Sequence, residues 1–257
     1  MSARARPMRR IVRAAGFAGI TAALLPPFAV RLGLARAAER PQVRDRWVGR
    51  WADALLELFA VRVSVHGSLP PASEGRLVVA NHRSTIDVAI LLSTFGGRMV
   101  SRADLSGWPL IGVAARSVGT IFVDRGKVKS GASTIRAMRD ALKRRETVCL
   151  FPEGTTFAGD DVRPFHAGSF SAALRTHAEI VPVGIAYERG SGAAFVDEPF
   201  LAHLSRMASA EPTRVVACVG EPIAVTDGAR AAVLAETARQ RVQALVHQAR
   251  GLVDPPA

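Results

Sequence analysis

The sequence predicts an α/β fold, in which a mostly parallel sheet is flanked by helices and the N-terminus carries membrane-associating helices. Short apolar runs of strand character alternate along the chain with longer segments of helical periodicity, and this alternation is typical of parallel sheets. An uncharged apolar segment lies near the N-terminus between arginines. With 257 residues, 49% of them hydrophobic, the chain is long enough to bury one substantial core.

The N-terminal apolar segment runs from Ala14 to Val30 and contains the pair Pro26-Pro27. It is shorter than the roughly 20 residues that span a bilayer comfortably, and the prolines are expected to break a straight helix. We therefore expect a monotopic or re-entrant anchor, with its arginines among anionic head groups. A short full span and a secretory signal peptide are the alternatives. The flanking arginines are Arg9, Arg10, Arg13 and Arg31.

The charge distribution indicates a membrane surface as a partner. The first 50 residues hold eleven arginines against Glu39 and Asp45, a net charge of +9, which leaves +3 for the remaining 207 residues. A nucleic-acid-binding domain would spread its basic residues more widely, whereas here they cluster beside the apolar segment. We expect an anionic membrane surface and no nucleic acid, with the protein on the cytoplasmic face of the inner or cell membrane.

An amphipathic helix is predicted over 44–58, because large apolar side chains recur there at a spacing of three to four residues. Its tryptophans suit either the core or the membrane interface. Residues 1–58 thus form a membrane-anchoring segment, 59–250 the α/β domain and 251–257 a loose tail. Strands are expected over 61–66, 77–80, 99–100, 119–123, 148–151, 180–185 and 214–219, and helices over 88–92, 130–145 and 230–252.

The cysteines and histidines indicate neither a metal nor a disulfide. Cys149 and Cys218 lie inside predicted strands, so both are expected to be buried and reduced. The six histidines show no ligand spacing, and no Walker or dinucleotide fingerprint is present. We therefore expect no metal and no cofactor.

A histidine and an aspartate follow the 77–80 strand. His82 comes just after the apolar run, and Asp87 stands five residues later, beside the next helix. Open α/β sheets bind ligands at such strand ends. A carboxylate on one imidazole nitrogen leaves the other free to take a proton near neutral pH. Because the chain has no G-x-S-x-G nucleophile motif, His82 is expected to act directly on a substrate hydroxyl.

Three more blocks place unusual residues on strands. The 119–123 strand ends in Asp124-Arg125, the 148–151 strand is followed by Glu153-Gly154, and Pro182 interrupts a strand that otherwise looks central. A proline there is disfavoured and indicates a special edge or bend. Each block alone is explained by a turn or a salt bridge. Together with the His–Asp turn, they describe an active site at one sheet edge.

In this order the four blocks resemble the motifs of the glycerolipid acyltransferases, the family of the bacterial 1-acylglycerol-3-phosphate acyltransferases. The resemblance covers about 61–223. It implies an O-acyltransferase that moves a fatty acyl group from acyl-CoA or acyl-carrier protein to the free hydroxyl of a lysolipid, without an acyl-enzyme. The matching residues are Asn81-His82-x-x-x-x-Asp87, Gly119-x-Ile121-Phe122-Val123-Asp124-Arg125, Phe151-Pro152-Glu153-Gly154-Thr155 and Val181-Pro182-Val183.

The resemblance also implies a role for each matching residue. His82 would be the general base, and Asp87 would orient it and stabilise its protonated form. Arg125 would bind the phosphate or another anionic group of the acceptor. The remaining substrate-binding positions would shape the acceptor pocket or lie near the acyl donor: Glu153, Gly154 and Thr155 for the pocket, and Pro182 for the donor.

Two positions depart from the phosphate-acceptor pattern. Thr156 stands where those enzymes generally carry arginine, and His166 where they usually carry lysine. The first acceptor implied is 1-acylglycerol-3-phosphate, which would give phosphatidic acid, and the alternative is another lysolipid such as lyso-ornithine lipid. Two other classes are a lipase or thioesterase, which would lack its nucleophile motif, and a non-enzymatic basic membrane-binding protein, which would leave the strand-end residues unexplained.

Overall fold

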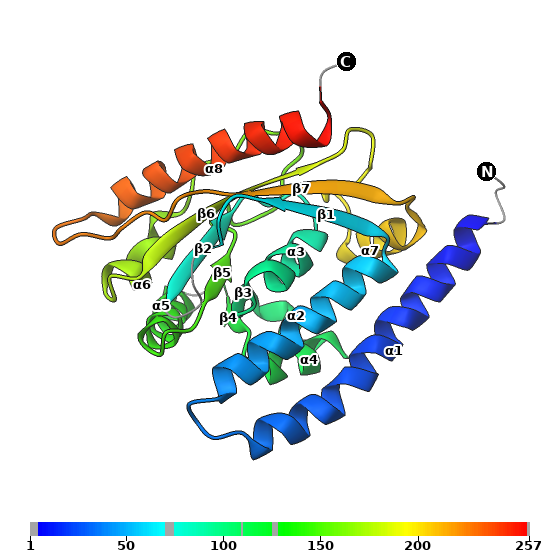
Figure 1. The fold of residues 1–257 in the computed structure, drawn as a ribbon, viewed down its shortest axis with the longest axis horizontal. Coiled ribbons are helices and arrows are strands. Elements are labelled where there is room, and N and C mark those ends of the chain that lie inside the picture. Colours follow the sequence, from blue (N-terminus) through cyan, green and yellow to red (C-terminus); the bar gives the residue numbers. More distant parts are fainter. Residues whose placement is uncertain (1–4, 70–74, 109, 125–127, 256–257) are drawn as a thin grey trace.

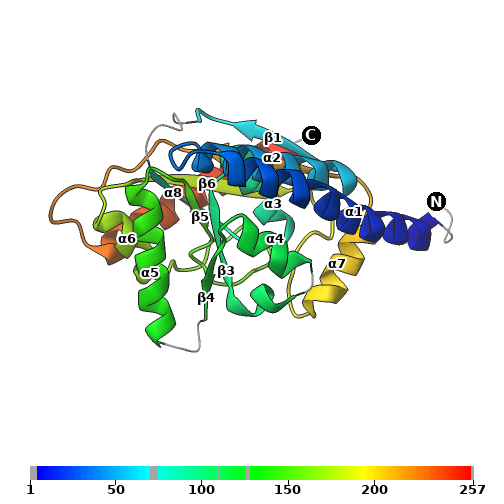
Figure 2. The same ribbon diagram turned by 90° about the horizontal axis from the view of Figure 1, so that it is seen from below.

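The computed structural model describes residues 5–69, 75–108, 110–124 and 128–255. A seven-stranded sheet lies between two layers of helices (Figures 1 and 2). The strands are β1 (Val61–His66), β2 (Arg76–Ala80), β3 (Arg98–Arg102), β4 (Ile121–Val123), β5 (Val148–Leu150), β6 (Glu179–Tyr187) and β7 (Thr213–Val219). The helices are α1 (Ala5–Leu34), α2 (Arg40–Leu58), α3 (Ile86–Phe95), α4 (Ile111–Ser117), α5 (Val128–Lys143), α6 (Ser171–Leu174), α7 (Phe200–Ser209) and α8 (Ala231–Val253), with short 3-10 helices at Ala103–Gly107 and Ala167–Phe170.

The sheet is mostly parallel, which confirms the predicted fold class. Its strand order is β1-β7-β6-β2-β5-β3-β4, and in the described residues only the β6–β7 pair is antiparallel. Strands β6, β2, β5, β3 and β4 therefore run in one direction. Their carboxyl ends meet at the same edge, which is the edge at which the sequence predicts the site.

Pro182 lies on the central strand β6, as the sequence indicates. It is tolerated there because regular pairing of β6 with β7 has not yet begun at this residue. Its carbonyl accepts a hydrogen bond from Gly220 N at 3.0 Å, just beyond the end of β7. Antiparallel pairing with β7 begins one residue later, at Val183. The backbone N–H that proline lacks would face β7, outside the regular β6–β7 ladder, so no ladder hydrogen bond is lost.

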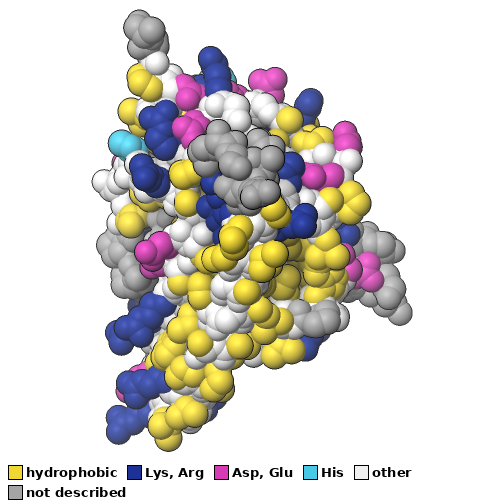
Figure 3. All heavy atoms as spheres, turned by 90° about the vertical axis from the view of Figure 1, so that its right-hand side faces the viewer, with side chains coloured by type: hydrophobic (Ala, Val, Ile, Leu, Met, Phe, Trp, Pro, Cys, Tyr) yellow, Lys and Arg dark blue, Asp and Glu magenta, His cyan; other side chains and the backbone are white. Residues whose placement is uncertain are grey.

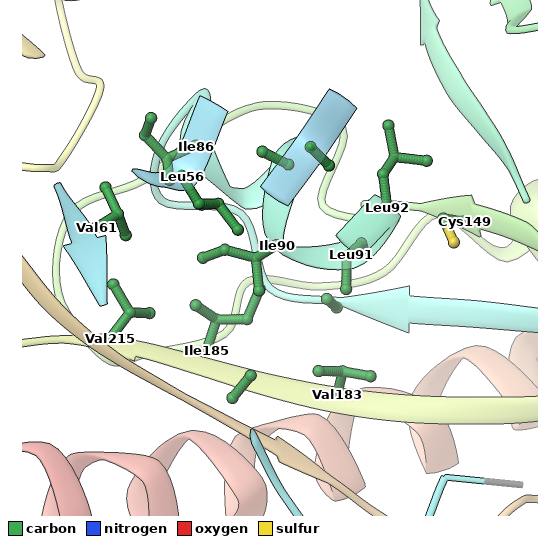
Figure 4. Packing of buried hydrophobic residues seen from close by; sticks show 14 of the residues in the cluster. Leu56, Val61, Ile86, Ile90, Leu91, Leu92, Cys149, Val183, Ile185 and Val215 are labelled. Carbon is green, nitrogen blue, oxygen red and sulfur yellow. The ribbon is translucent and has the colours of Figure 1, made fainter. Parts of the chain in front are cut away.

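Each face of the sheet has its own apolar core. Along β2, Leu77 and Val79 face α5 and α8, whereas Val78 and Ala80 face α2 and α3, as the two-residue period of a strand requires. Figure 4 shows the second of these cores, where Ile90 of α3 meets Ile185 of β6. This packing fixes α3, and with it the turn that precedes α3, on the edge of the sheet.

Helix α1 continues through Pro26-Pro27, so the expectation that the prolines break it is wrong. Prolines remove two backbone donors, but contacts with α2 hold the helix on both sides of them. Trp51 Nε1 donates to Thr21 Oγ1 at 3.1 Å, and the rings of Phe28 and Trp47 are 6.2 Å apart. Tertiary packing thereby outweighs the local preference.

The arginines before the apolar segment do not all face outward, as a head-group role would require. Arg13 is buried and donates to the carbonyls of Leu58 at 2.9 Å and Ala210 at 2.8 Å. Arg9 donates to the same Ala210 carbonyl at 2.9 Å. These two arginines therefore cap the region where α7 ends, a favourable place for cations. This interlocking of α1 with the domain also argues against a cleaved signal peptide.

Apolar side chains nevertheless remain exposed along α1. Pro7–Leu34 is long and apolar enough to cross a membrane by length and composition. Met8, Ile11 and Val12 are each more than half exposed, as is Leu201 of α7. Figure 3 shows a broad hydrophobic band on this side of the molecule, with basic side chains along its border. Membrane association is compatible with this surface.

Candidate active site

The turn after β2 is built by side chains that tie it to two other elements. The Asn81 side chain donates to Ile185 O at 2.9 Å and accepts from Ile185 N at 2.8 Å, which fixes the turn to β6. Asp87 lies in the first turn of α3, where its Oδ2 accepts the backbone N–H groups of Arg83 at 2.6 Å and Ser84 at 2.8 Å. A carboxylate is favoured at this end of a helix.

The structure brings His82 and Asp87 together as predicted. His82 Nδ1 lies 2.9 Å from Asp87 Oδ2, and because a carboxylate only accepts, Nδ1 carries the hydrogen. Nε2 accepts no hydrogen bond from the described part of the chain. The ring stacks on Phe151 with centroids 3.9 Å apart and planes 5° apart, so its orientation is fixed. Asp87 is fully buried, and the His82 side chain is 19% exposed.

Glu153 is adjacent to this pair but points into the protein. Its carboxylate accepts from His82 N at 2.7 Å and Arg163 N at 2.9 Å, and it pairs with Arg83 Nη1 at 2.9 Å. Both members of the ion pair are buried. Glu153 therefore supports the loop that carries His82, while its neighbour Gly154, at φ +83°, makes the turn that leads to the cavity wall.

A cavity of about 920 Å³ opens beside His82. Gly154, Thr155 and His82 line it, whereas Glu153 and Pro182 are not among its described lining residues. Most of its wall is apolar and comes from α1, α2, α3, α4 and α5, with Phe17, Leu25, Trp51, Ile111 and Met138 among the contributors. A cavity of this size and character suits a long apolar chain.

Few cations reach the cavity. Apart from His82, its described lining contains only Arg102 and His166 as basic residues. Arg102 ends β3 and pairs with Asp104 at 3.0 Å, and its side chain is 65% exposed. Arg102 was not predicted from the sequence, although it ends a strand as the residues before His82 do. Arg125, the predicted anion-binding residue, lies outside the described residues.

Thr156 lines the cavity, but its hydroxyl is engaged within the protein. Its hydroxyl donates to Phe195 O at 2.5 Å, and Phe195 N donates to Arg83 O at 2.8 Å. These bonds join the segment before α7 to the His82 turn. Position 156 thus supplies no cation to the cavity.

The cysteines are buried and free, as predicted. Burial raises the pKa of the Cys149 thiol to about 12, so it is not a nucleophile near neutral pH. In the part of the chain that the structure describes, no group of three or more His, Cys, Asp or Glu side chains is arranged to hold a metal ion.

Comparison with known proteins identifies the family. The Acyltransferase family profile matches residues 62–186. The lyso-ornithine lipid O-acyltransferase of Pseudomonas aeruginosa is 32% identical over 248 residues, which are 94% of this chain and 93% of that protein. This chain belongs to the glycerolipid acyltransferase family. The predicted family and the O-acyltransferase class are therefore confirmed, and the hydrolase and non-enzymatic alternatives give way to them.

Other members of the glycerolipid acyltransferase family carry a different acceptor in their names. The 1-acyl-sn-glycerol-3-phosphate acyltransferase of Neisseria meningitidis is 27% identical over 152 residues, 59% of this chain and 60% of that protein. The crystal structure of the Thermotoga maritima 1-acyl-sn-glycerophosphate acyltransferase has a TM-score of 0.72 with 20% identity, and covers 95% of this chain and 97% of that one. This likeness shows a shared fold.

Proposed function

We propose that this acyltransferase moves a fatty acyl group from a thioester donor to the free hydroxyl of a lysolipid, with His82 as general base. The observation that carries the proposal is the His82–Asp87 pair, at 2.9 Å, beside a large apolar cavity. Asp87 fixes Nδ1–H, so Nε2 is the nitrogen that takes a proton. The donor is either acyl-CoA or acyl-carrier protein.

The reaction then needs no covalent enzyme intermediate. The acceptor hydroxyl gives its proton to His82 Nε2 while its oxygen attacks the thioester carbonyl carbon. The C–S bond breaks as the tetrahedral intermediate collapses, and the leaving thiolate takes the proton back from the imidazolium. Asp87 stabilises the imidazolium between these steps, and the stacked Phe151 ring keeps the imidazole in plane.

Two observations favour lyso-ornithine lipid as the acceptor. The Pseudomonas relative that carries this acceptor in its name matches nearly the whole chain. Thr156 and His166 also stand where the phosphate-acceptor enzymes carry arginine and lysine, so two permanent cations are absent here. The Thr156 hydroxyl is bonded to Phe195 O. An ornithine head group carries an ammonium as well as a carboxylate, so it needs fewer cations than a phosphate does.

1-Acylglycerol-3-phosphate is the second candidate acceptor, and its product would be phosphatidic acid. It is supported by the Neisseria relatives and by guanidinium groups after two neighbouring strands: Arg102 at the end of β3 and Arg125 in the sequence after β4. Guanidinium suits bidentate binding of phosphate. In either case the acceptor is a membrane lipid, and the exposed apolar side chains of α1 would meet an anionic bilayer on its cytoplasmic face.

The test is acyl transfer by the purified protein to each lysolipid, with acyl-CoA and acyl-carrier protein compared as donors. His82→Ala is expected to lose the roughly 10²–10⁴-fold contribution of a general base, and near-full activity in this variant would refute the mechanism. Thr156→Arg is expected to raise the ratio of lysophosphatidate to lyso-ornithine turnover. Thr226→Arg, at an exposed position after β7, is the control that should leave the ratio unchanged.

A further inference from the structure

We propose that Tyr187 is a positioning residue that fixes the Asp87 carboxylate and sets the pH range in which His82 accepts a proton. The inference rests on the proposed role of His82 as base. Tyr187 is the last residue of β6, 100 positions from Asp87 in sequence, and its hydroxyl donates to Asp87 Oδ1 at 2.5 Å.

The two oxygens of Asp87 have different partners. Oδ2 accepts from His82 Nδ1 and from the backbone N–H groups of Arg83 and Ser84. Oδ1 accepts from the Tyr187 hydroxyl, and no other hydrogen bond reaches it from the described residues. Because Asp87 is fully buried, losing this donor would leave half of the carboxylate without a partner.

The position of the phenol is determined by the sheet. Asn81 bonds to both the N–H and the carbonyl of Ile185, which fixes β6 against the turn that carries His82. Tyr187 lies two residues further along the same strand, so its side chain projects on the same face as that of Ile185. Both belong to the apolar core that contains α3. The register of β6 therefore delivers the hydroxyl to Asp87.

The phenol is a donor throughout the working pH range. Burial, together with the neighbouring Asp87 carboxylate, raises the pKa of Tyr187 well above its ordinary value of 10. It therefore stays protonated at every pH at which the enzyme would be assayed, and its role toward Asp87 is that of a neutral hydrogen-bond donor.

The other charged groups around this network are paired elsewhere. Glu153 and Arg83 neutralise each other in the adjoining loops. From α7, His203 contacts Ser84 Oγ at 3.4 Å and Glu198 at 3.0 Å, and burial lowers the pKa of His203, so it is neutral near pH 7. From α8, Arg250 donates to the Tyr187 carbonyl at 2.5 Å and not to its hydroxyl.

Removing the hydroxyl would concentrate the negative charge of Asp87 on Oδ2, beside His82. The imidazolium would be held more tightly, and the base would become free only at higher pH. Tyr187→Phe is therefore expected to move the acid limb of the kcat/KM profile upward by about 0.5–1 pH unit. At pH 6 the loss should reach at most about three- to tenfold and should shrink above pH 8, with KM for both substrates nearly unchanged.

The chain offers a second and opposite perturbation, because Tyr187 is its only tyrosine. Biosynthetic replacement of tyrosine by 3,5-difluorotyrosine changes this one residue and makes the phenol more acidic, hence a stronger donor. The acid limb should then move to lower pH. A residue with a purely structural role would shift neither profile, and the fluorinated enzyme keeps the test available even where Tyr187→Phe folds poorly.

The profiles are read against two controls. Thr213→Val removes another buried hydroxyl, which bonds to Glu211 O at the start of β7, and should leave the acid limb in place. His82→Ala separates the two proposals. If it keeps its activity, the base assignment fails. If it is inactive while the Tyr187→Phe and fluorotyrosine profiles superimpose on the wild-type profile, only the role of Tyr187 is overturned.

Discussion

Asp87→Asn removes the negative charge of the aspartate and keeps nearly the same side-chain shape. Three donors meet at Oδ2, so the amide oxygen must take that place and the amide NH₂ must face Tyr187. The phenol can rotate to accept from it, and the turn is expected to keep its geometry. What disappears is the negative charge beside the imidazolium that would form in the proposed mechanism, when His82 takes the acceptor proton.

Two interaction energies set limits on the expected loss of transition-state stabilisation in Asp87→Asn. A hydrogen bond to a charged group contributes about 1.5–3 kcal/mol. Two unit charges separated by the observed 2.9 Å interact by about 6 kcal/mol at an effective dielectric constant of about 20. The His82 side chain is 19% exposed, so water weakens the second figure. A loss of about 3–4 kcal/mol corresponds to a fall in kcat/KM of about 10²–10³-fold.

The assay is steady-state acyl transfer at pH 7.5, with thermal unfolding measured in parallel. Asp87→Ala leaves the Arg83 and Ser84 N–H groups without their acceptor, so it should lower both activity and stability. Asp87→Asn should lower activity with little change in the unfolding temperature. A kcat/KM within threefold of the wild-type value in folded Asp87→Asn protein would refute the electrostatic reasoning.

Three further outcomes are expected. Glu153→Gln removes the buried partner of Arg83 and should cost about 3–5 kcal/mol of unfolding free energy in urea denaturation; a cost below 1 kcal/mol would contradict the role assigned to the pair. Arg13→Ala should destabilise by at least about 2 kcal/mol and speed proteolysis between α1 and α2, whereas exposed Arg10→Ala should stay within about 0.5 kcal/mol. With the pKa of Cys149 raised to about 12, only about one thiol in 10⁴ is ionised at pH 8, so iodoacetamide should label this residue in urea but not in the native protein.

Most of the sheet could be predicted from local sequence. The seven expected strands are all present, because each is a short apolar run bounded by turn residues. Strand order was not predictable, since nothing local to 213–219 reveals that β7 lies between β1 and β6 and runs against β6. Helix α4 was missed because its seven residues are too few to show a period. Helix α7 was missed although its sequence is amphipathic, with His203 and Met207 on the buried side, and the division into 1–58, 59–250 and 251–257 stays a prediction.

The site was predictable where its residues are close in sequence. His82 and Asp87 are five positions apart, so a turn and a helix start are enough to bring them together. Tyr187 and Arg102 reach the site only through the pairing of strands, which a single sequence does not encode locally. Glu153 stood out in the sequence, but its direction depends on Arg83, whose burial could not be foreseen. The roles of Arg125 and Pro182 stay predictions.

The helices before the sheet have a consequence for how the family can diversify. Phe17, Leu25 and Trp51 belong to α1 and α2, outside the 62–186 match to the family profile, yet they line the cavity beside His82. Part of the cavity wall that would hold the lipid therefore lies outside the stretch that carries the proposed base. If the cavity holds the lipid as proposed, substitutions in the first 58 residues would change lipid preference while the His82 turn stays the same, and exchanging this segment between relatives would test it.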